Sequence, residues 1–291
     1  MKRKSTYLVT LLAWLTLGAA HGAERVVVYS WPKTMQADER GSYPIELLQL
    51  ALSKSGRAIV ARPSEFAMSQ YRTLKQLEMN KGIDVVWTMT NAEREQQLRP
   101  IRIPIDRGLI GWRLLAIQQK DFELFQNLPD ETALKTLLTV QGIDWPDYEI
   151  LQTNGFKVTP SNFFDGMYQM LQVGRVRFFA RSLTEIWPEL KSLRDSDRPI
   201  VVAPRWVMHY PAALYFFVRT DDEELASAIE SGLDAALKDG SMKNLFLQHF
   251  QGILDQADLQ HREVVELTNK GLPPQTPIQR SELWFNPKQG F

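Results

Sequence analysis

The sequence offers few side chains that could do chemistry, and the most suggestive of them is an arginine. Arg94 lies in a short polar helix expected to follow Asn91, soon after a strand predicted at Ile83–Trp87. Its guanidinium is a planar fork of N–H donors that matches a carboxylate with two bonds at a time. Because most charged side chains only solvate a surface, the residue types alone favour an exposed arginine on a polar helix.

Aromatic side chains at the ends of predicted strands form the second set of candidates. Tyr29 and Trp31 follow the first strand, Trp87 ends another, and Trp145 begins a helix. In α/β folds ligands gather at the carboxyl ends of strands, and small-molecule sites are often walled by aromatic rings. Core packing is the alternative for each of these residues. For Trp31 and Trp145 we favour the pocket.

Signals for catalysis or metal binding are weak. The chain has no cysteine, which excludes a thiol nucleophile, thiolate metal ligands and a lipid-modified cysteine. Beyond residue 24 the histidines are His209, His249 and His261, too far apart in the sequence to form a known motif. We therefore expect no catalytic residue, no metal and no cofactor.

Residues 1–23 have the composition of a secretory signal peptide. Three basic residues precede an uncharged apolar run from Tyr7 to Leu17, and small residues then cluster up to Ala23. The apolar run is short for a membrane span, so an uncleaved anchor is the less favoured alternative. We expect cleavage within residues 20–23 and a protein free in the periplasm. The mature chain then has 34 − 3 = 31 basic against 34 acidic residues, a balance that does not favour a nucleic-acid partner.

The remaining chain must position these candidates with alternating β-rich and amphipathic helical segments. Strands are predicted at Arg25–Tyr29, Ala58–Ala61, Ile83–Trp87, Leu137–Val140, Lys157–Thr159, Val176–Ala180, Ile200–Val202 and Ala213–Val218. Helical patterns separate most of them, which predicts an α/β fold of parallel sheets with helices on both faces. About 270 mature residues exceed the usual size of one compact domain and favour two lobes.

Four segments, in order, resemble family 3 extracellular solute-binding proteins. Ser42–Gly56 (SYPIELLQLALSKSG) is similar to the first helix, and Ile83–Ile117 to the signature region. Phe164–Ala180 resembles a helix and strand of the second lobe, and Leu225–Phe250 the closing helices. The resemblance implies a type II periplasmic-binding-protein fold, in which each lobe is a mostly parallel sheet flanked by helices. It also places the chain near a poorly characterised subgroup with a C-terminal extension.

The same resemblance implies a division of the chain. Residues 24–113 and 209–250 would form lobe 1, residues 114–208 lobe 2, and residues 251–291 an extended C-terminal tail. Two hinge crossings are expected near Gly111–Leu115 and near Val207–Pro211. Closure about such a hinge would bury a ligand between the lobes.

In amino-acid-binding members of this family, the arginine that matches Arg94 holds the carboxylate of the ligand. The resemblance therefore turns Arg94 into the leading binding residue, with Thr88 and Thr90 as its polar neighbours. The second lobe departs from the family, because Arg181 and Ser182 stand where those members carry an aspartate that accepts the ligand's ammonium group.

An arginine at this place disfavours an ordinary α-amino acid, since it would face the ammonium group with a like charge. Two arginines in one cleft favour an anion instead, such as a carboxylate or dicarboxylate. The alternative is that Arg181 pairs with Glu185, one helical turn later, and never meets a ligand.

The function implied by the resemblance is that of a monomeric protein that hands a small solute to an inner-membrane ABC importer without chemistry. A periplasmic sensor that reports to a membrane receptor or kinase is the alternative. A dehydratase-like enzyme on the same scaffold is less favoured. It would need a placed acid or base, and Glu46 is the first-lobe carboxylate that could be tested for that role.

Overall fold

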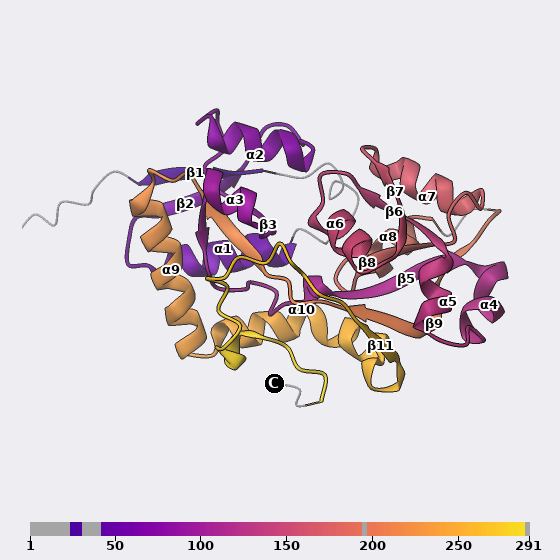
Figure 1. The fold of residues 1–291 in the computed structure, drawn as a ribbon. Helices are drawn as coiled ribbons and strands as arrows, with labels where there is room; N and C mark the ends of the chain where they lie inside the picture. Colours follow the sequence, from indigo (N-terminus) through magenta and orange to yellow (C-terminus); the bar gives the residue numbers. More distant parts are fainter. Residues whose placement is uncertain (1–23, 31–41, 194–196, 289–291) are drawn as a thin grey trace, which may run out of the picture.

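The computed structural model describes residues 24–30, 42–193 and 197–288, which form two α/β lobes side by side (Figure 1). The predicted signal peptide and Trp31 lie outside the described residues. Among the residues described, no helix combines the length and the apolar character needed to cross a membrane.

The strands and helices follow the alternation expected from the sequence. The strands are β1 (Arg25–Tyr29), β2 (Ile59–Pro63), β3 (Val86–Met89), β4 (Arg99–Ile101), β5 (Trp112–Gln118), β6 (Leu138–Gly142), β7 (Lys157–Ser161), β8 (Phe178–Ser182), β9 (Ile200–His209), β10 (Leu214–Val218) and β11 (Glu263–Glu266). The α-helices are α1 (Ser42–Lys54), α2 (Gln70–Glu78), α3 (Ala92–Gln97), α4 (Phe122–Gln126), α5 (Glu131–Thr136), α6 (Pro146–Thr153), α7 (Phe164–Gln172), α8 (Ile186–Ser192), α9 (Glu223–Lys238) and α10 (Ser241–Ala257). Each predicted strand is present, β1 with the predicted ends and the others with shifted ends, whereas β4, β5 and β11 have no counterpart among the strands predicted from the apolar pattern.

The first lobe is built on β1, β2, β3, β4 and β10. β1 and β2 pair in parallel, and β10 lies antiparallel between β3 and β4. The run LYFFV of β10 is apolar on both faces: Phe216 packs towards α1, α9 and α10, and Phe217 towards α2. Such two-sided burial is typical of a strand covered by helices on both sides.

The second lobe is a six-stranded sheet in the order β11-β9-β5-β8-β6-β7. β6 pairs in parallel with β7 and β8, whereas β5 runs antiparallel to both β8 and β9. Consecutive side chains of β8 again point to opposite faces of the sheet. Phe178 packs with α4, α5 and α6, and Phe179 packs with α7 and α8. The parallel strands bring their carboxyl ends to one edge of the sheet, where α6 and α8 begin after short connections.

The two crossings between the lobes touch each other at a glycine. The backbone N–H of Tyr210 donates to the carbonyl oxygen of Gly111 at 3.2 Å. A Cβ atom on Gly111 would lie 2.1 Å from the carbonyl oxygen of Tyr210, so no other residue fits there without a shift. This close approach joins the start of β5 to the end of β9.

The C-terminal region differs from the extended tail expected at residues 251–291. α10 continues to Ala257 because Ile253 and Leu254 prolong its apolar face beyond Gly252. Further on, β11 adds a parallel edge strand to β9, and Thr268 exchanges two hydrogen bonds with the side chain of Asn154. The yellow segment in Figure 1 then runs across the junction of the lobes.

The end of this tail docks on the first lobe. The Trp284 ring covers Gly108, where an added Cβ would lie only 2.6 Å from it. The backbone N–H of Phe285 donates to the Arg107 carbonyl oxygen at 2.7 Å. The tail is therefore a packed part of the fold that contacts both lobes.

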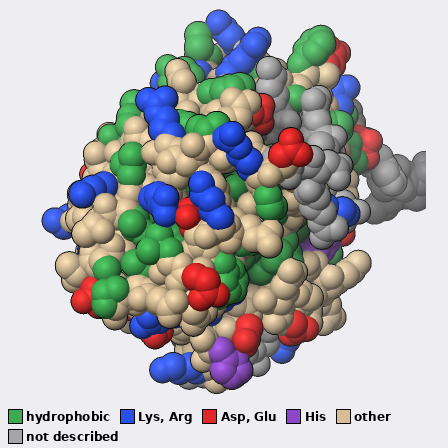
Figure 2. Space-filling view, turned by 90° about the vertical axis from the view of Figure 1, so that its right-hand side faces the viewer, with side chains coloured by type: hydrophobic (Ala, Val, Ile, Leu, Met, Phe, Trp, Pro, Cys, Tyr) green, Lys and Arg blue, Asp and Glu red, His purple; other side chains and the backbone are tan. Residues whose placement is uncertain are grey.

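The second-lobe end of the molecule presents a mixed surface. On the coloured part of the face in Figure 2, basic, acidic and apolar side chains are interspersed. A nucleic-acid-binding face would instead gather basic side chains into a continuous patch or stripe.

Candidate functional site

Arg94 folds back from α3 onto the end of β3. The side chain of Asn91 caps α3 by accepting the backbone N–H of Arg94 at 2.8 Å, which fixes where the arginine leaves the helix. Its Nη1 then donates to Thr88 Oγ1 at 2.9 Å and to the carbonyl oxygen of Met89 at 2.6 Å. Arg94 is only 7% exposed, so it is not the solvated surface arginine that its residue type alone suggests.

The other nitrogen of Arg94 reaches beyond its own strand. Nη2 donates to Gln70 Oε1 on α2 at 2.9 Å and to the carbonyl oxygen of Asp144 at 3.1 Å. Asp144 stands just before α6 in the second lobe, so Arg94 bridges the two lobes.

The charge of Arg94 is buried among neutral oxygens. Its four hydrogen-bond partners are a hydroxyl, an amide oxygen and two backbone carbonyls, and among the described residues no carboxylate lies within ion-pair distance. Burial lowers the pKa of Arg94 to about 10, while the more distant Asp144 and Asp147 partly oppose this effect. A buried cation without a contacting counter-charge is an environment that favours an anion.

The other first-lobe candidates differ in whether their side chains contact Arg94. Thr88 is buried and contacts Arg94 directly, whereas Thr90 Oγ1 donates to Glu95 Oε1 at 2.7 Å. Tyr29 is 4% exposed and packs against Trp87 with ring centroids 6.0 Å apart. Thr88 therefore belongs with Arg94, whereas Thr90 bonds Glu95 and Tyr29 belongs to the hydrophobic core.

In the second lobe, Arg181 forms ion pairs with two glutamates of the same lobe. Nε and Nη2 bond the two carboxylate oxygens of Glu189 at 2.8 and 2.6 Å, and Nη2 lies 3.1 Å from Glu185 Oε1. Burial alone would lower the pKa of Arg181, but Glu185 and Glu189 raise it well above its usual range. The pairing with Glu185, kept open as an alternative, is present. The charge of Arg181 is thus neutralised inside the lobe, which removes the reason for expecting it to bind an anion.

Aromatic rings enclose the same guanidinium. Its carbon lies 4.8 Å from the ring centroid of Trp145, 5.0 Å from that of Phe179 and 5.6 Å from that of Phe164. The half-buried Trp145 ring lies directly over Gly142, where a Cβ would be 2.6 Å from it. Ser182 is fully buried and donates its hydroxyl to the Leu109 carbonyl oxygen at 3.2 Å. Trp145 thus flanks Arg181, and Ser182 joins β8 to the loop before β5.

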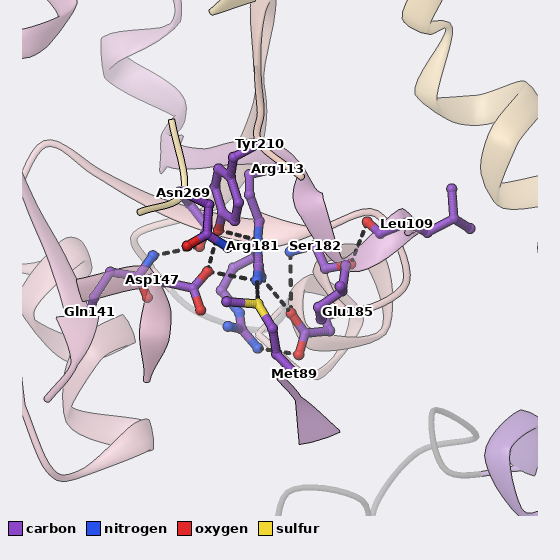
Figure 3. A network of polar contacts seen from close by, with 12 residues as sticks. Met89, Leu109, Arg113, Gln141, Asp147, Arg181, Ser182, Glu185, Tyr210 and Asn269 are labelled. Carbon is purple, nitrogen blue, oxygen red and sulfur yellow. Dashed lines mark hydrogen bonds and ion pairs between the residues drawn. The ribbon is translucent and has the colours of Figure 1, made fainter. Parts of the chain in front are cut away.

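One functional candidate has no counterpart in the sequence-based predictions. Arg113, on β5, is 2% exposed, and its Nη2 lies 2.6 Å from Asp147 Oδ1 on α6 (Figure 3). Its Nη1 lies 3.2 Å from Glu185 Oε2, and Nε donates to the hydroxyl of Tyr210 at 2.8 Å. The signal that could have revealed it is a single charge inside the otherwise apolar strand WRLLAI.

One hollow lies between α6, the tail and the residue that caps α3. This hollow of about 20 Å³ is lined by Asn91 of the first lobe, four residues of α6 and residues 269–271 of the tail. Such a volume admits little more than water. A larger cavity of about 230 Å³ lies by the turn between α9 and α10 and contains none of the predicted site residues.

The histidine and acidic side chains are the residues that could serve metal binding or acid–base chemistry. Within the described part of the chain, no three histidine, aspartate or glutamate side chains are placed to share a metal ion. Glu46, the carboxylate that an enzymatic role could use, has its Oε2 3.1 Å from His249 Nε2 of α10, and its side chain is 42% exposed.

Comparison with known proteins identifies the fold. No protein-family model and no curated protein matches this sequence. An ancestral arginine-binding protein bound to arginine superposes with a TM-score of 0.57 at 18% identity, covering 77% of this chain and 98% of the other. A Salmonella typhimurium periplasmic binding protein with high arginine specificity gives 0.56 at 15% identity, covering 78% and 99%.

A third solved structure is a Bacillus subtilis protein assigned as the extracellular-binding protein of an amino-acid ABC transporter. It gives a TM-score of 0.56 at 16% identity and covers 77% of this chain and 97% of its own. The chain therefore has the two-lobed fold of extracellular solute-binding proteins, and the fold expected from the sequence is confirmed.

Proposed function

We propose that this protein captures a small carboxylate-bearing solute between its two lobes and performs no chemistry on it. The observation that carries the proposal is Arg94, a buried guanidinium held only by neutral oxygens at the junction of the lobes. A ligand carboxylate would supply the missing counter-charge through charge-assisted hydrogen bonds.

The contacts of Arg94 indicate how a ligand would be accommodated. Nη1 is anchored to the end of β3 by Thr88 and Met89, so the guanidinium keeps its place when the lobes separate. The bonds of Nη2 to Gln70 and to Asp144 are the ones that a carboxylate would replace. Trp145, beside Asp144, would form the second-lobe wall.

Binding requires the lobes to open, since Arg94 is buried and already bonds the Asp144 carbonyl oxygen of the second lobe. The crossings that touch at Gly111 and Tyr210 are where we place the hinge. Closure would then bring the loop before α6 back onto Arg94 with the ligand between them.

The fold supports a role in uptake from the periplasm. Among the solved structures with this fold, one is assigned to an amino-acid ABC transporter and another is described as periplasmic. We propose that this protein delivers its solute to an inner-membrane importer, after export by the signal peptide at residues 1–23. All three comparison proteins are binding proteins, which supports a role without catalysis.

Thermal unfolding of the protein from Glu24 onward, against millimolar amino acids, keto acids, mono- and dicarboxylates and sugars, tests this proposal. A ligand present at about a hundred times its dissociation constant stabilises the fold by roughly 2.7 kcal/mol, a rise in Tm of a few degrees at this size. We expect such a rise with one class of carboxylate. A rise with uncharged sugars alone, or with nothing, would refute the proposed function.

A further inference from the structure

A cation that belongs to the chain itself fills an acidic pocket where the lobes meet. Arg113 points from β5 towards the carboxylates of Asp147 and Glu185, at 2.6 and 3.2 Å (Figure 3). Asp147 lies in the first turn of α6, and Glu185 lies directly before α8. Both acids therefore stand beyond the carboxyl ends of second-lobe strands, on the side where ligands of α/β sheets bind.

Groups outside the second lobe complete the enclosure of Arg113. The sulfur of Met89, at the end of β3 in the first lobe, lies 4.0 Å from Nη2. Tyr210, at the end of the second crossing, accepts from Nε and donates its own hydroxyl to Asp147. The guanidinium is thus surrounded by the first lobe, the second lobe and the crossings between them.

This pocket adjoins the proposed carboxylate site. Met89 contacts both arginines: its carbonyl oxygen accepts from Arg94, and its sulfur contacts Arg113. Asp147, which pairs with Arg113, also acts electrostatically on Arg94. A ligand whose carboxylate is held by Arg94 would therefore have its neighbouring atoms close to Arg113 and its two acids.

We propose that Arg113 determines the charge of the ligand by occupying this acid pair as a built-in cation. The inference rests on the proposed function and specifies its substrate class. A solute with an ammonium group beside its carboxylate would find Asp147 and Glu185 already paired with the Arg113 guanidinium, so these acids could not serve as its counter-charge without breaking buried ion pairs. The fitting ligands are keto acids, hydroxy acids and plain carboxylic acids.

The acid pocket itself is tested by removing the Arg113 guanidinium by mutation and supplying a small guanidinium ion from solution. In Arg113→Ala the carboxylate of Asp147 loses its ion-pair partner, and Glu185 loses one contact but keeps that with Arg181, so Tm falls. Millimolar methylguanidinium should then raise the Tm of this variant by about 3 °C relative to its own baseline, because the ion stabilises the state that binds it. The control is Arg205→Ala, which removes a partly exposed guanidinium paired with Glu263 at 2.6 Å, and methylguanidinium should not raise its Tm. A folded Arg113→Ala protein that does not respond overturns the proposal.

Ligand selection is tested on the unmodified protein and needs no variant to fold. Thermal shifts with glutamate and 2-oxoglutarate, and with alanine and pyruvate, compare each amino acid with the keto acid of the same skeleton. For the unmodified protein we expect thermal shifts with the keto acids and none with the amino acids. In Arg113→Ala the ratio of the affinity for the amino acid to that for the keto acid should rise by about tenfold or more. Equal shifts for both members of a pair in the unmodified protein overturn the role of Arg113.

Failure of this inference can be distinguished from failure of the proposed function. If no carboxylate binds the unmodified protein, the proposed function fails and the specificity role of Arg113 fails with it. If amino acids bind as well as keto acids, the proposed function stands and only the role of Arg113 is lost.

Discussion

Replacing Arg94 by methionine is expected to weaken binding of the best carboxylate by about 100-fold or more, because truncating one partner of a buried, hydrogen-bonded charge pair commonly removes 2–5 kcal/mol. Methionine retains much of the length of the side chain but has no donor for the carboxylate. Thr88, Gln70 and the loop before α6 would still form the surrounding walls. Isothermal titration of both proteins with the same carboxylate measures the difference.

The matched control is Arg72→Met, which removes an equal charge from the exposed side of α2 in the same lobe. Its affinity should remain within about twofold of the unmodified protein, since exposed charges interact weakly across water. Equal losses in the two variants would show that net charge, and not the placed guanidinium of Arg94, governs binding.

Replacing Glu189 by glutamine is expected to lower the free energy of unfolding by about 3 kcal/mol, because it leaves a buried guanidinium with an incomplete counter-charge. The Glu189 side chain is 1% exposed, bonds Arg181 with both oxygens and accepts the Tyr168 hydroxyl at 2.5 Å. The amide keeps the shape of the carboxylate but turns one acceptor into a donor that faces other donors. Urea unfolding followed by circular dichroism gives the change.

The chain offers a control of the same geometry on its surface. Glu263 bonds Arg205 with both oxygens at 2.6 and 2.7 Å, but its side chain is 54% exposed. Glu263→Gln should leave the urea midpoint almost unchanged, since water solvates either partner once the pair is lost. If both variants unfold at the same urea concentration, burial does not set the strength of the Arg181–Glu189 pair.

The parts of the site that could be predicted depend on short spacings along the chain. Asn91 before a polar helix predicts the cap, and the cap fixes where Arg94 leaves the helix. Asp222 caps α9 for the same local reason, by accepting the backbone N–H of Leu225 at 3.2 Å. The strand–helix alternation likewise predicts the α/β class, because each element carries its own apolar pattern.

The parts that could not be predicted depend on contacts between distant segments. Glu189 lies eight residues beyond Arg181, and only the packing of α8 on β8 brings the two together. The surroundings of Arg113 come from β3, α6, the residue after β9 and the residue before α8, which no spacing in the sequence relates. The pairing of β11 with β9 depends on where the chain returns after α10.

The central claim, that the buried guanidinium of Arg94 holds a ligand carboxylate between two lobes, is tested most directly by calorimetric titration with a matched pair of ligands. The protein from Glu24 onward is titrated with the carboxylate that gives the largest thermal shift and with its primary amide, which has nearly the same shape and no charge. We predict saturable binding of the carboxylate and an affinity for the amide that is lower by about 100-fold or more. Equal affinities for the two compounds would contradict the claim.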